Sequence, residues 1–129
     1  MHINIETIPH EMQRYPTVGD YWQEGNIEQV RVSAMKDWRY EVLVTIHELI
    51  EMALTRQHGV SEGAITEFDI KFETERLEGL RFGEPGDDPD APYRREHMFA
   101  TKLERLLAAE LDVDWDQYEL YVDSLGFKK

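Results

Sequence analysis

Two short stretches near the N-terminus, residues 2–8 and 27–34, alternate apolar and polar positions. The apolar positions are Ile3, Ile5, Val30 and Val32. A period of two is typical of strands, whose side chains point alternately to the two faces of a sheet. Turn residues separate the stretches, at 15–19 and at 23–26. The pattern predicts a small antiparallel meander of two or three strands within residues 1–35.

Beyond residue 36 the apolar residues are spaced three and four positions apart, as in amphipathic helices. Four segments show this spacing: residues 37–57, 61–77, 93–111 and 114–125. Asp37 is a suitable N-cap for the first helix, and Gly59 is a suitable stop. Residues 83–92 hold three prolines, two glycines and several acids, so they predict an acidic loop between the second and third helices.

Together the two patterns predict one domain of the α+β class over residues 1–129. A small N-terminal antiparallel sheet would pack on three longer helices and a short C-terminal helix. The sheet belongs to residues 1–35 and the helices to residues 36–129.

The charge of the chain restricts its partners. It carries 27 acidic and 14 basic residues, for a formal net charge of −13. Such a surface repels nucleic-acid phosphates and anionic membranes, so neither is expected as a partner. No apolar run approaches the roughly 18 residues that span a bilayer, and no leader pattern begins the chain. We therefore expect a soluble cytoplasmic protein.

The first predicted helix contains the pentapeptide His47-Glu48-Leu49-Ile50-Glu51. An imidazole and a carboxylate four residues apart point the same way on a helix, which is the spacing of two ligands to one metal ion. The chain has no cysteine, so any metal must be held by histidine, aspartate or glutamate. His47 and Glu51 fall at the shoulder of the apolar face, where clefts form.

The second and third helices carry polar residues on or beside their apolar faces. Asp69 lies within the apolar arc of its helix, and a carboxylate there must be hydrogen-bonded, ion-paired or bound to metal. His97 and Glu104 lie together at the edge of the apolar arc of the third helix. If the three helices pack on one another, these groups can converge with His47 and Glu51.

Each of these residues also has an ordinary structural explanation. The His47–Glu51 pair can be a surface or capping hydrogen bond, and Asp69 can form a salt bridge with Arg76. His97 can be a histidine at the core edge whose hydrogen bonds are satisfied. The aspartates of residues 87–90 can hold calcium, although they lack the alternation and terminal glutamate of an EF-hand loop.

Three parts of the chain together resemble small uncharacterised proteins of bacteriophages and prophages. They are residues 10–20, the pentapeptide at 47–51, and residues 84–97 without residue 90. The resemblance covers nearly the whole chain. It implies an accessory protein made in a bacterial cytoplasm, and it brings no activity with it.

The pentapeptide is also similar to the active-site helix of the zincin metallopeptidases, whose motif is His-Glu-x-x-His. That resemblance implies that His47 is a ligand, that Glu48 is the general base and that Glu51 stands in the second ligand position. Glutamate at this position makes the ligand set harder and more anionic, so iron or manganese is reasonable beside zinc.

The most economical site has His47, Glu51 and His97 as ligands of one divalent metal, with zinc as the first choice. Asp69 would be a fourth ligand or an outer partner, and Glu104 would orient His97 through its second ring nitrogen. Two histidines and one carboxylate leave positions open for a water, which suits hydrolysis of an amide or phosphate bond.

Two other functions compete with the metal-dependent hydrolase. One is a non-catalytic acidic accessory or inhibitor protein that binds a host protein. The His/Glu/Asp cluster would then be structural, or would hold a metal that stabilises the fold. The other is an all-helical nucleotide pyrophosphatase in which Glu48 and Glu51 bind magnesium. This interpretation leaves His47 and His97 without a role, and the N-terminal strands do not fit an all-helical domain.

Overall fold

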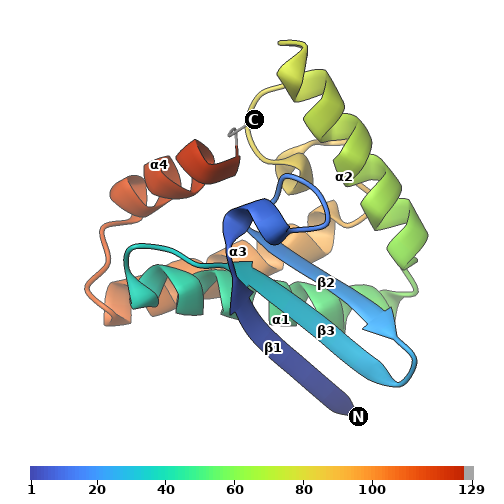
Figure 1. Cartoon of the computed structure of the whole chain (residues 1–129), viewed down its shortest axis with the longest axis horizontal. Coiled ribbons are helices and arrows are strands. Elements are labelled where there is room, and N and C mark those ends of the chain that lie inside the picture. The colour runs from blue at the N-terminus through green and yellow to red at the C-terminus, as the bar shows by residue number, and fades with distance from the viewer. Residues whose placement is uncertain (127–129) are drawn as a thin grey trace.

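A three-stranded sheet followed by four α-helices makes up the protein in a computed structural model that describes residues 1–126 (Figure 1). The strands are β1 (His2–Ile8), β2 (Gly19–Glu24) and β3 (Ile27–Ser33), and the helices are α1 (Trp38–His58), α2 (Glu62–Leu77), α3 (Arg94–Glu110) and α4 (Trp115–Gly126). Two short 3₁₀ turns, η1 (His10–Met12) and η2 (Pro85–Asp87), lie in the loops. The predicted α+β class, with three longer helices and a shorter C-terminal one, is confirmed.

The sheet is mixed, whereas the sequence predicted an antiparallel meander. Its strand order is β1-β3-β2, with β2 antiparallel and β1 parallel to β3. Strand directions alternate along the chain as expected, but β3 lies between the other two. Val30 and Val32 of β3 are completely buried, and the most buried of the three strands occupies the centre. The ten residues 9–18 give the chain enough length to carry β2 past that position.

Helix α1 forms the middle layer of the protein. It packs against β2 and β3 on one side and lies alongside α3 (Figure 1). Its ends are as predicted: the Asp37 carboxylate accepts a hydrogen bond from the Arg39 amide, and Gly59 ends the helix in the left-handed conformation, with φ of 72°. Leu43 is fully buried in this layer. No helix within residues 1–126 is long and apolar enough to cross a membrane.

The acidic loop between α2 and α3 is folded back onto α3. Its only regular element among the described residues is the turn η2, as the prolines and glycines predicted. Gly86 of this turn is buried against the imidazole of His97. The loop therefore closes one side of the space between α1 and α3.

Candidate metal centre

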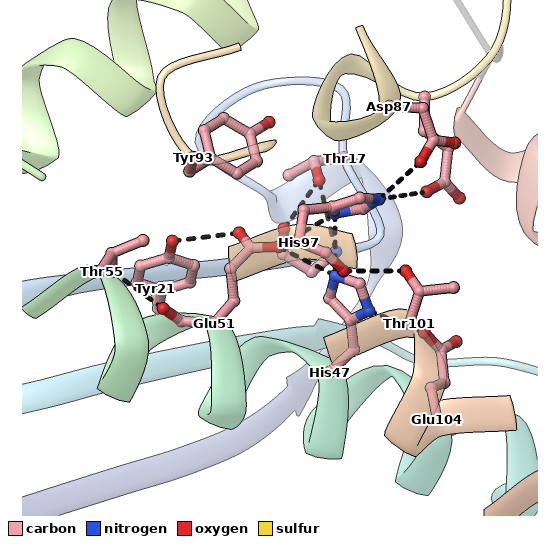
Figure 2. A network of polar contacts seen from close by, with 12 residues as sticks. Thr17, Tyr21, His47, Glu51, Thr55, Asp87, Tyr93, His97, Thr101 and Glu104 are labelled. Atoms are coloured by element: carbon pink, nitrogen blue, oxygen red, sulfur yellow. Dashed lines mark hydrogen bonds and ion pairs between the residues drawn. The ribbon is translucent and has the colours of Figure 1, made fainter. Parts of the chain in front are cut away.

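Three donor atoms from α1 and α3 meet at one point (Figure 2). His47 and Glu51 lie one turn apart on α1, and the Nε2 of His47 is 2.9 Å from the Oε2 of Glu51. The Nδ1 of His97 on α3 lies 3.0 Å from each of these atoms. All three residues are buried. The predicted convergence of a pair on the first helix with His97 on the third is thus what the structure shows.

The outward nitrogen of His47, the ring nitrogen that faces away from the other two donors, is held by a carboxylate. Its Nδ1 lies 2.7 Å from the Oε1 of Glu104, and the other Glu104 oxygen accepts a hydrogen bond from the Tyr118 hydroxyl. A carboxylate can only accept, so the Nδ1 of His47 carries the proton. Nε2 is then the nitrogen whose lone pair can bind a metal. Glu104 does hold a histidine, but it is His47, whereas the sequence had assigned it to His97.

The outward nitrogen of His97 faces two carboxylates from the acidic loop. Its Nε2 lies 3.2 Å from the Oδ1 of Asp87 and 3.4 Å from the Oε2 of Glu84. Sequence reasoning did not place Glu84 or Asp87 beside His97. The available signal was the turn Glu84-Pro85-Gly86-Asp87, which brings both acids to one side just before α3.

The third donor, Glu51, is held from the sheet. Its Oε1 accepts a hydrogen bond of 3.0 Å from the Tyr21 hydroxyl on β2, which leaves Oε2 directed at the two imidazoles. Tyr21 is buried and was not predicted to have this role. The second polar atoms of His47 and Glu51 are therefore each hydrogen-bonded to a partner that fixes their orientation, whereas the Nε2 of His97 faces carboxylates at longer distances.

Glu48 lies beside this cluster without being one of the three donors. It is buried, and it lines the cavity next to Glu51. Burial, and then repulsion by the Glu51 carboxylate, raise the pKa of Glu48 well above its usual value. A Cβ added at Gly19 would lie 2.6 Å from the Glu48 Cγ, so the glycine allows β2 to approach α1 at this point.

Asp69 is held by two tyrosines in the wall of the same cavity. Its Oδ2 accepts a hydrogen bond of 3.0 Å from Tyr15, and its Oδ1 accepts one from Tyr93. Burial raises the pKa of Asp69 to about 7, although both hydroxyls act against this. Arg76, its predicted salt-bridge partner, binds the Glu73 carboxylate at 2.9 Å. The need for partners at Asp69 was foreseen, but their identity was not.

A cavity of about 130 Å³ opens over the three donors. One arginine and the two histidines of the cluster contribute its basic groups. Seven carboxyl groups line it: Glu48, Glu51, Asp69, Glu73, Glu84, Glu104 and Asp123. The environment is strongly acidic, and such a site attracts cations.

In the metal-free protein, hydrogen bonds and ion pairs between the two histidines and the surrounding carboxylates favour protonated imidazoles. Burial lowers the pKa of His47, but hydrogen bonds to Glu104 and Glu51 outweigh it and raise that pKa well above its usual value. For His97, burial is likewise outweighed by Asp87, Glu51 and Glu84, and the pKa rises to about 12. The same pairing lowers the pKa of Glu51 to about 2 against the effect of burial. A divalent cation would replace these protons.

No protein-family model, curated protein or solved structure matches the chain. The resemblance to phage and prophage proteins and the similarity to zincins therefore rest on the quoted residues alone.

Proposed function

We propose that this protein binds a divalent transition metal through His47, Glu51 and His97 and uses it for hydrolysis. The observation that carries the proposal is the set of outer contacts. Glu104 occupies the outward nitrogen of His47, Tyr21 occupies the second oxygen of Glu51, and carboxylates face the outward nitrogen of His97. Metal-binding histidines and carboxylates in proteins are oriented in this way.

The donor set narrows the choice of metal. Two imidazoles and one carboxylate with open positions are typical of catalytic zinc, so zinc is the first ion to test. The three donor atoms lie 2.9–3.0 Å apart. A face of an octahedron with bonds of about 2.1 Å has edges of about 3.0 Å, which is the arrangement of two histidines and one carboxylate around iron. Iron and manganese are therefore the alternatives.

The surrounding residues indicate how the site would work. The metal would supply a water whose pKa is lowered towards neutrality. Glu48, the carboxylate beside the donors in the cavity, is the group proposed to take the proton of that water. A nearby cation favours the ionised form of Glu48, which opposes the effects of burial and Glu51. An acidic cavity repels phosphates, so an amide bond is the preferred substrate class.

The first test is elemental analysis of the untagged protein beside His47→Ala. The expected result is about one transition metal per chain in the native protein and none in the variant, because the variant loses one of three donors. His2→Ala, at an exposed histidine of β1, is the matched control and should keep the metal. Equal metal content in the native protein and His47→Ala would overturn the proposal, as would no metal in either after zinc, iron and manganese are offered.

Glu48→Gln separates the base from the ligands. We expect the variant to keep its full metal content while hydrolysis of a panel of model amides falls about 100-fold, the usual effect of losing a general base. Metal content and initial rates would be measured on the same preparation. Loss of the metal in Glu48→Gln would make Glu48 a ligand and remove it from the role of base.

One observation favours the competing proposal of an accessory protein that binds a host protein in a bacterial cytoplasm. Leu77, Leu80 and Phe82, at and after the end of α2, are 55%, 66% and 86% exposed. If these side chains, which lie within six positions of one another, form a contiguous patch, that patch would suit an interaction surface. In that case the metal is a structural ion, and chelation would unfold the protein. Removal of a catalytic metal would instead leave the fold intact.

A further inference from the structure

His97 has carboxylates near both of its ring nitrogens. Nδ1 lies 3.0 Å from the Oε2 of Glu51, inside the three-donor cluster, and Nε2 faces Glu84 and Asp87 on the other side of the ring. The second group, Glu84, Asp87 and His97, also has its ligand atoms close enough to surround one ion. One buried imidazole is thus shared by two candidate sites, one towards the core and one towards the acidic loop.

The Nε2 of His97 has no well-formed hydrogen bond. His97 is 5% exposed, and its Nε2 is buried without a hydrogen bond of acceptable geometry. Its distances to Asp87 and Glu84, 3.2 and 3.4 Å, exceed the roughly 2.7–2.9 Å of a charge-assisted bond. The corresponding contact of His47 with Glu104 is 2.7 Å. A buried nitrogen facing two carboxylates at these distances has room for a cation between them.

We propose that Glu84, Asp87 and the Nε2 of His97 bind a second divalent cation, so that the His97 ring bridges two metal ions. The inference rests on the proposed function, because the inner ion at Nδ1 is the one described there. When the outer ion binds, the proton on Nε2 leaves to solvent and the ring bridges as imidazolate. With metal–nitrogen bonds of about 2.0–2.1 Å on both sides of the ring, the ions would lie roughly 6 Å apart.

Exposure predicts the order in which the sites fill. The side chains of Glu84 and Asp87 are 43% and 56% exposed, whereas those of His47 and Glu51 are 10% and 5% exposed. The inner ion is therefore held in the drier, more pre-organised site and should bind first and more tightly. The outer ion lies at the cavity mouth and should exchange readily with solvent.

The distance between the two ions also determines whether the outer ion can take part in activating the water of the inner ion. Two-metal hydrolases place their ions about 3.5–4 Å apart, so that both contact the same oxygen. At roughly 6 Å the outer ion would not share the inner ion's water. It would instead tie the acidic loop to α3 and offset the carboxylates at the cavity mouth, which gives an anionic group of a substrate a place to bind.

The test is metal stoichiometry at saturation, by equilibrium dialysis against copper(II) with electron paramagnetic resonance of the same samples. The native protein should bind two ions and show a diminished copper signal at full loading, because an imidazolate bridge couples the two spins. Glu84→Gln/Asp87→Asn should bind one ion with an undiminished signal. Asp90→Asn, an exposed acid of the same loop, is the matched control and should behave as the native protein.

The outcomes separate this inference from the proposed function. One ion in both the native protein and the double variant, lost in His47→Ala, overturns the outer site and leaves the inner one standing. One ion that is lost in the double variant and kept in His47→Ala overturns the inner site and the bridge together. Two ions without spin coupling overturn the bridge, since the second ion is then bound elsewhere.

Discussion

Gly86→Ala is expected to abolish stoichiometric metal binding although it removes no donor atom. A Cβ at this position would lie 2.3 Å from both the Cγ and the Nδ1 of His97, and real Cβ atoms essentially never approach other atoms closer than 3.0 Å. The added methyl and the imidazole cannot occupy the same space. Either η2 moves outward or the ring rotates, and both displace the Nδ1 of His97 from the other two donors. Since a metal requires its ligands within a few tenths of an ångström, we expect affinity to fall at least ~100-fold.

Gly63→Ala is the control for this substitution. Gly63 lies in α2 with open space where its Cβ would stand, so the change should leave metal binding as it is. Metal affinity would be measured by competition with a chromophoric chelator, and folding by circular dichroism. Native affinity in a folded Gly86→Ala protein would show that His97 is not held against this turn in the metal-bound protein, and the three-donor site would be wrong.

The helices could be predicted from the sequence because their signals are local. Asp37, Gly59 and the prolines of residues 83–92 act on neighbouring backbone, so the ends of α1 and the position of the acidic loop followed from them. The order of the strands depends on contacts between distant residues. The local pattern is equally compatible with β2 at the centre, as in a meander. The complete burial of Val30 and Val32 favours β3 at the centre only once α1 covers the sheet.

The candidate site divides in the same way. The shared direction of His47 and Glu51 is a property of one helix, and the position of His97 at the edge of an apolar face brought it towards them. The partner of Glu104 depends on how far α3 is shifted along α1, which periodicity does not specify. The roles of Tyr21 and Asp87 depend on where a strand and a loop meet those helices, so only the structure reveals them.

The metal-free protein should lose stability as the pH rises from 6 to 9. His97 has a folded-state pKa of about 12, against an ordinary value of 6.5. The stability that its protonation contributes is fully present below about pH 6.5 and is lost as the pH rises towards 12. Asp69, with a pKa of about 7, adds to the loss between about pH 4 and 7, because its folded form retains a proton that the unfolded chain releases. Glu51 acts at the acid end, where its contribution is present above about pH 4.5 and is lost as the pH falls towards 2.

Thermal and urea unfolding of chelator-treated protein would measure this dependence. One pKa unit corresponds to about 1.4 kcal/mol, so His97 contributes at most roughly 3 kcal/mol to the loss of unfolding free energy between pH 6.5 and 9. His97→Gln is the control and should flatten the slope. Saturating metal should reverse it, because the ion binds only the deprotonated imidazoles and its stabilising effect grows with pH. A slope that stays the same with and without metal would mean that the ion does not replace the protons of His47 and His97, and the assignment of their nitrogens as ligands would fail.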